Sequence, residues 1–178
     1  TAFGMTLFVA VAAISGLFYY STFSKYPIHR TIESTVIYSA RVSDLFFTSE
    51  FNLLYGGLKE KAELLFPAVV RRGVYAEHNL FWGVIPIILF ILSFRLVQRS
   101  SYKKLWTSFL ILLVLSFLLS LGPTIIFSDT VQFPGPYRLL YSTNPLFGFL
   151  RTPARFGVFT FFFLALVIAL TWIEIEKR

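Results

Sequence analysis

The sequence predicts an all-α integral membrane protein, with about four transmembrane helices and two long outer loops that carry short interfacial helices. Of its 178 residues, 56% are hydrophobic and only 14% are charged, whereas soluble domains average about 45–50% apolar and about 25% charged residues. The mean hydropathy is +0.72. Such a chain cannot hide its apolar side chains in one core, so we expect lipid to cover much of its surface.

Four apolar segments are the predicted spans, within a single membrane domain over residues 1–178. Each has roughly the length that a helix needs to cross a bilayer, and they cover about residues 1–20, 80–96, 105–121 and 156–173. Only a helix satisfies its own backbone groups in lipid. Aromatic residues, which favour the membrane–water interface, stand near the ends of these segments: Tyr19, Tyr20, Trp82, Trp106 and Trp172.

The loop charges predict an orientation. Four cations fall within residues 95–104, namely Arg95, Arg99, Lys103 and Lys104. Because short basic loops stay in the cytoplasm, we expect the loop 97–104 to be cytoplasmic. Both termini then lie in the cytoplasm as well, and the long loops 21–79 and 122–155 face outward.

Several classes of function are excluded by composition. The absence of Cys excludes disulfides and thiolate chemistry, and His29 and His78 are too few for an imidazole metal cluster. No cofactor is evident, although a divalent cation stays open. The net charge of +7 lies on residues between apolar spans, which favours anionic membrane lipid and not nucleic acid as partner.

The chain opens on Thr1 and carries no Lys or Arg before Lys25, so the basic region of a signal peptide is missing. We therefore expect a C-terminal piece of a longer polytopic protein. The remainder of the same polypeptide would then be one of its partners.

In the first outer loop, a short helix is predicted between Gly57 and Pro67. Lys59 and Glu63 are four residues apart and pair on one side. Four apolar residues share another face, which needs a lipid or protein surface to cover it: Leu58, Ala62, Leu65 and Phe66.

Two weaker signals lie in the same loop. The β-branched residues of 31–38 favour a short strand. Asp44 and Glu50 would contact a sugar or a divalent cation, or else Asp44 caps the turn that follows it and Glu50 pairs with Arg41. In the second outer loop, Asp129 fits a turn.

The strongest candidate site is the start of the last span. Thr152 stands where a helix cap is expected, and Pro153 at the first helical position. Arg151 and Arg155 are four residues apart, so we expect them on one face, where guanidinium groups and helix N–H groups would bind a lipid phosphate or pyrophosphate. Arg138 in the preceding loop is a further candidate. The alternative is that the arginines anchor the helix to ordinary headgroups.

A second candidate site precedes the second span. Glu77 would act as a general base or bind a hydroxyl-rich substrate, with His78 beside it. The alternative is structural, because an acid at a helix start complements the helix dipole and His78 or Asn79 completes the cap.

Three motifs resemble the C-terminal half of bacterial polytopic GT-C-type glycosyltransferases, including the YfhO-like membrane proteins. They are Tyr75–Gly83 (YAEHNLFWG), Leu121–Pro123 (LGP) and Leu150–Phe156 (LRTPARF), and the likeness covers most of residues 35–170. The resemblance implies a bacterial plasma-membrane protein that transfers a sugar from a polyprenyl-phosphate donor to an acceptor on the outer face. It also implies that the catalytic acid lies upstream of Thr1, so no catalytic residue is assigned here.

Two other functions stay open. One is a non-catalytic membrane scaffold or assembly subunit whose loops bind a partner protein. The other is a lipid or solute transporter, which usually needs ionisable residues or broken helices at mid-span. No span carries a charge at mid-depth, and only Pro86 interrupts one.

Overall fold

The computed structural model describes residues 31–48, 52–67, 80–143 and 152–177, and singly Ala13, Leu17, Ser21, Phe147 and Leu150. The chain forms two compact units, Thr1–Arg30 and Thr31–Arg178, and all that follows concerns the second. The predicted span over 1–20 lies outside the described residues, apart from two isolated positions within it.

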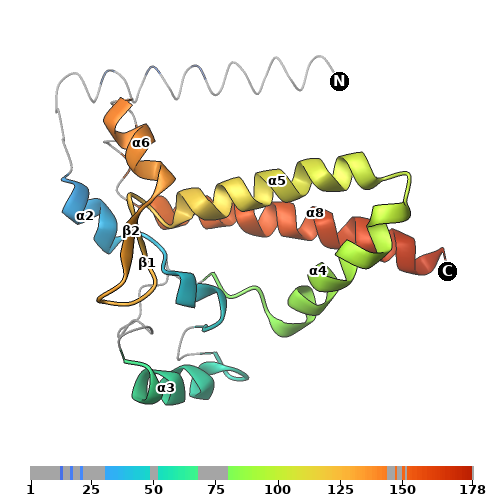
Figure 1. Ribbon diagram of the computed structural model, residues 1–178, viewed down its shortest axis with the longest axis horizontal. Coiled ribbons are helices and arrows are strands. Elements are labelled where there is room, and N and C mark those ends of the chain that lie inside the picture. Colours follow the sequence, from blue (N-terminus) through green and yellow to red (C-terminus); the bar gives the residue numbers. More distant parts are fainter. Residues whose placement is uncertain are drawn as a thin grey trace. The chain divides into compact units, whose positions relative to one another are not determined.

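The described part of the chain is mostly helical (Figure 1). In chain order its elements are α2 (Ile32–Ile37), η1 (Val42–Leu45), α3 (Gly56–Leu65), α4 (Val84–Leu96), η3 (Val97–Arg99), α5 (Lys103–Ser120), β1 (Thr124–Ile126), β2 (Gln132–Pro134), α6 (Pro136–Thr143), η4 (Pro153–Phe156) and α8 (Gly157–Glu176). The all-α prediction is therefore correct for the bulk of the fold and wrong for one hairpin.

Within the described residues, two helices are long and apolar enough to cross a membrane, as predicted for 105–121 and 156–173. One is α5, Lys103–Ser120, and the other is the continuous helical segment Pro153–Glu176 that contains α8. The two lie side by side in Figure 1 and pack extensively on each other. Their outward side chains are large and apolar, as at Ile111 and Phe162, which are 60% and 57% exposed.

The seam between α5 and α8 is built from small and polar residues as well as apolar ones. The residues that α8 buries lie along one helix face and are Gly157, Thr160, Leu164, Val167, Leu170 and Thr171. Ser116 of α5 meets Thr160 at a hydroxyl–hydroxyl distance of 3.1 Å within this seam. Buried Ser and Thr inside an apolar exterior are typical of helices that pack in lipid.

The second predicted span, 80–96, is not confirmed, because α4 has 13 residues and Leu80 to Gly83 are not helical. At 1.5 Å per residue it is about 20 Å long, against a hydrocarbon core of about 30 Å. Gly83 has a φ of 86° just before the helix, and Pro86 falls in its first turn, so the helix begins late.

Aromatic rings join α4 to α5. Trp82, Phe90, Phe94 and Trp106 form successive edge-to-face pairs, with centroids 5.3, 5.2 and 5.1 Å apart. Trp106 is 6% exposed and packs in a core with Val167 and Leu170 of α8. The prediction that Trp106 faces outward as an interfacial anchor is therefore wrong, because its ring packs between helices.

The segment between the long helices contains the unpredicted hairpin. Gly122, at a φ of 73°, follows α5 and turns the chain into β1. β1 pairs with β2 in antiparallel fashion, and Thr124, Ile125 and Ile126 face Pro134, Phe133 and Gln132. α6 follows at once, so a short helix in this loop is as expected.

The predicted strand over 31–38 is wrong, because Ile32–Ile37 is the helix α2. Thr31 caps it, since the Ser34 amide donates to the Thr31 hydroxyl at 3.2 Å and the Ser34 hydroxyl donates to the Thr31 carbonyl. This local cap outweighs the modest strand preference of β-branched residues.

The predicted helix after Gly57 is confirmed as α3, and so is its Lys59–Glu63 ion pair at 3.5 Å. Three of the four residues of the predicted apolar face are left uncovered by the described part of the chain. Ala62 is buried, whereas Leu58, Leu65 and Phe66 are 58%, 72% and 59% exposed.

The Ser116–Thr160 contact should contribute a measurable coupling between α5 and α8. Interhelical hydrogen bonds of this kind average about 0.6 kcal/mol, so we expect that coupling from a double-mutant cycle with Ser116→Val and Thr160→Val. Reversible unfolding of the protein in bicelles would measure it. Thr107→Val is the matched control, because the Thr107 hydroxyl is exposed and donates to the Lys103 carbonyl of its own helix. A coupling equal to that of the Thr107/Thr160 cycle would contradict the packing described here.

Candidate functional site at the start of α8

The segment Tyr38–Arg41 passes between the end of α5 and the start of η4. The Ala40 amide donates to the Ser120 carbonyl at 3.0 Å, and the Ala154 amide donates to the Tyr38 carbonyl at 3.3 Å. These two backbone bonds hold three distant parts of the chain together. The start of the last helix is thus positioned by a loop from the first third of the sequence.

A small apolar core lies beneath this crossing and consists of Ala40, Leu80, Leu121 and Ala154. The backbones approach so closely that a Cβ atom at Gly122 would overlap the Ser39 side chain. Gly157 is similarly covered by Leu80. The junction is therefore tightly packed, and it fixes where η4 and α8 begin.

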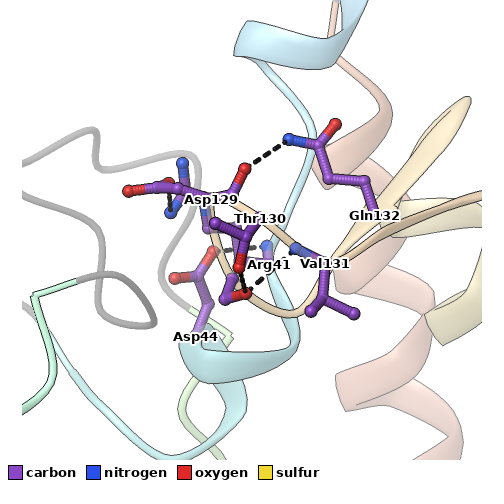
Figure 2. Close-up of polar contacts among 7 residues, drawn as sticks. Arg41, Asp44, Asp129, Thr130, Val131 and Gln132 are labelled. Atoms are coloured by element: carbon purple, nitrogen blue, oxygen red, sulfur yellow. Dashed lines mark hydrogen bonds and ion pairs between the residues drawn. The ribbon is translucent and has the colours of Figure 1, made fainter.

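Figure 2 shows the polar link between the two long loops. The Arg41 guanidinium contacts the Asp129 carboxylate at 3.2 Å, across 88 positions of sequence. Asp44 accepts a hydrogen bond from the Arg41 backbone amide at 2.8 Å, so it caps the turn η1 that contains it, and not the turn after it as predicted. Gln132 donates to the Asp129 carbonyl at 3.2 Å and closes the hairpin tip.

A cavity of about 200 Å³ lies beside η4. It is lined by Leu150, Thr152, Arg155, Phe156 and Phe159. One cationic and one hydroxyl-bearing side chain therefore share a hollow whose other walls are leucine and phenylalanine. This combination suits a ligand with an anionic head and an apolar body.

Tyr137 supports one wall of this cavity from α6. Its side chain is fully buried, its hydroxyl donates to the Phe147 carbonyl at 2.9 Å, and its ring centroid lies 6.3 Å from that of Phe156. Burial, with a smaller contribution from Tyr141, raises the pKa of Tyr137 to about 12. The neutral phenol is thus the form that the fold holds in place.

The last helical segment begins where predicted, but the structure of its first turn differs from the prediction. Thr152 occupies the cap position and Pro153 begins the helical segment, but Thr152 makes no side-chain capping bond, and Pro153–Phe156 is a 3₁₀ turn. The predicted common face of Arg151 and Arg155 stays a prediction, since Arg151 lies outside the described residues.

Of the other predicted site residues, some are described by the structure and some are not. Arg138 is exposed on α6 and is not among the described residues that line the cavity beside Arg155. Glu77, His78 and Glu50 lie outside the described residues, so the site before the second span stays a prediction. Arg41 pairs with Asp129.

Neither the burial of Tyr137 nor the Arg41–Asp129 ion pair was predicted from the sequence. Tyr137 follows Pro136 at the start of a short helix, and nothing in that pattern distinguishes a buried tyrosine from an exposed one. The ion pair joins residues 88 positions apart, and only an alignment of related sequences would have revealed it.

No cluster of three or more His, Cys, Asp or Glu residues that would hold a metal ion occurs in the described part of the chain. Asp44 and Asp129 instead bind the backbone and the guanidinium of Arg41. A divalent cation therefore has no ligand set among the described residues.

Comparisons with known proteins return no matching protein family, no matching curated protein and no matching solved structure.

The buried phenol of Tyr137 should make stability depend on pH in the alkaline range. An unfolded tyrosine ionises near its ordinary pKa of 10.0, whereas in the folded chain it ionises near 12. The folded state is therefore favoured below pH 10, and we expect this contribution to be lost as the pH rises from 10 to 12.

Thermal unfolding in detergent between pH 8 and 12 would measure this loss, with Tyr137→Phe as the variant in which it is reduced. Tyr55→Phe is the control, since the Tyr55 ring packs on Phe81, whereas the Tyr137 ring packs on Phe147 and Phe156. Identical pH profiles for the parent chain and Tyr137→Phe would refute the assignment.

Proposed function

We propose that this chain is part of a membrane glycosyltransferase that takes a sugar from a polyprenyl-phosphate donor and passes it to an acceptor on the outer face of the membrane. The observation that carries the proposal is the cavity at the start of α8, where Arg155 stands among apolar walls. Support also comes from the two helices that are apolar enough to cross a bilayer.

In this proposal the donor phosphate lies against Arg155 and the first isoprene units lie along Phe156 and Phe159. When the sugar transfers, the nucleophilic atom of the acceptor forms a bond to the anomeric carbon, the bond between that carbon and the phosphate oxygen breaks, and the lipid phosphate leaves with the electron pair. A guanidinium beside that oxygen stabilises the growing negative charge. In this proposal a carboxylate of the full-length protein, for which no residue of this chain is assigned, accepts the proton that the acceptor loses.

A second candidate function is a non-catalytic scaffold or assembly subunit. It is favoured by a shallow apolar hollow of about 390 Å³ on α5, lined by Leu110, Ile111, Val114, Leu115 and Leu118. This surface suits the side chains of another membrane helix. Under this proposal, changes in the hollow disrupt assembly, and changes at Arg155 do not affect it.

The role of Arg155 is tested by Arg155→Gln in lipid nanodiscs. A hydrogen bond to a charged group contributes about 1.5–3 kcal/mol, so we expect affinity for polyprenyl phosphate to fall about 10- to 100-fold. Arg95→Gln is the control, because Arg95 is an exposed cation in the last turn of α4. Arg151→Gln, measured in the same way, tests whether the second arginine shares the ligand.

Polyprenol of the same length lacks the phosphate, so it distinguishes the contribution of the ligand's charge to binding from that of its hydrocarbon chain. Arg155→Gln should leave polyprenol binding unchanged, whereas Phe159→Ala should weaken both ligands. Phe162→Ala, at a comparably exposed ring outside the cavity, should weaken neither. Equal affinity of the parent chain and Arg155→Gln for polyprenyl phosphate would overturn the proposed site.

A further inference from the structure

The helix α3 presents its leucines outward together with Glu60 and Lys61, and it turns the Lys59–Glu63 ion pair inward. Lys59 and Ala62 are 9% and 7% exposed, and Lys59 pairs with Glu63 at 3.5 Å on that inner side. The leucines are the outward residues, with Leu58 at 58%, Leu64 at 79% and Leu65 at 72% exposed. A helix that faced water would be turned the other way.

The apolar surface extends beyond the helix at both ends. Leu53 and Leu54 precede it and are 102% and 82% exposed, and Phe66 follows it at 59%. Six large apolar side chains within fourteen residues are thus presented together on one short segment. An exposed group of this size on a folded chain indicates an apolar partner surface.

One cation, Lys61, stands among the outward leucines of α3, and Glu60 is exposed at the edge of that face. Lys61 is exposed, and it falls between Leu58 and Leu65 at the i, i+3, i+7 spacing of a single helix stripe. A lysine among leucines is typical of helices that lie in the plane of a membrane, since its long side chain reaches past the apolar layer to the phosphates. A face that packed on a protein core would instead exclude this charge.

The location of α3 is also consistent with contact with a membrane. The ring of Tyr55, the residue before α3, packs edge-to-face on Phe81 at 5.2 Å, close to the start of α4. Along α4 the outward residues are again apolar, with Ile85 and Ile91 at 70% and 61% exposed. The leucine face is therefore anchored beside a helix that also requires an apolar environment.

From these observations we infer that α3 is a membrane-surface helix: its leucine face (Leu54, Leu58, Leu64 and Leu65) inserts into the acyl boundary of the bilayer, and Lys61 contacts anionic headgroup phosphates. The inference does not depend on the glycosyltransferase proposal, because no residue of the Arg155 cavity takes part in it. It gives the first long loop a function of its own, which is to hold that part of the chain against the lipid.

The absence of Cys from the whole chain makes the test direct. Single spin labels are placed at Leu58→Cys, Leu65→Cys and, as control, Thr130→Cys in the exposed hairpin tip, and the full chain is reconstituted into vesicles of phosphatidylcholine with one-quarter phosphatidylglycerol. Collisions with oxygen report lipid contact, and collisions with a water-soluble nickel chelate report water contact. We expect high oxygen and low nickel accessibility at both leucine positions, and high nickel accessibility at position 130.

The role of Lys61 is tested by the lipid composition. We expect nickel accessibility at position 65 to rise when phosphatidylglycerol is omitted, and this dependence to be lost in Lys61→Gln while Glu60→Gln retains it. High nickel accessibility at both leucine positions would overturn the inference. So would low accessibility to both reagents, which would indicate a protein partner, and dipolar broadening between labels would identify that partner as a second copy of this chain.

Discussion

The seam between α5 and α8 is the constraint on which the rest of the described structure depends. Because Ser116 meets Thr160 near one end, and the Ser100 hydroxyl donates to Glu174 at 2.7 Å near the other, the two helices run antiparallel along their whole length. The end of α5 is thereby set beside the start of α8. Every feature of the candidate site, from the Tyr38–Arg41 crossing to the Arg155 cavity, is built on that fixed pair of helix ends.

The same principle organises the seam and α3, although they differ in size. In both, one pair of polar side chains makes contact within the chain while large apolar side chains point away from it. Ser116 and Thr160 do this between two helices, and Lys59 and Glu63 do it within a single short one. A chain with 14% charged residues has few ions to place, and within the described ranges several of them are used for internal pairing.

The long helices could be predicted from sequence because they depend on composition alone, and an unbroken apolar run has one stable form in lipid. Shorter elements depend on local competition. The cap at Thr31 reversed the expectation of a strand, and Gly83 with Pro86 shortened α4. The β1–β2 hairpin has three-residue strands, too short for an alternating pattern to be recognised. Arg155 was found because a cation next to an apolar helix start is unusual in itself, whereas burial of Tyr137 follows only from tertiary packing.

The central claim is that α5 and α8 cross a membrane as an antiparallel pair, which places the loop at Ser101 and the hairpin tip at Thr130 on opposite sides. Single Ser101→Cys and Thr130→Cys variants of this cysteine-free chain, treated with a membrane-impermeant maleimide on intact cells, test this claim most directly. The account predicts labelling at position 130 in intact cells and at position 101 only after permeabilisation. Labelling of both positions in intact cells would contradict the crossing, and the reverse pattern would contradict the orientation.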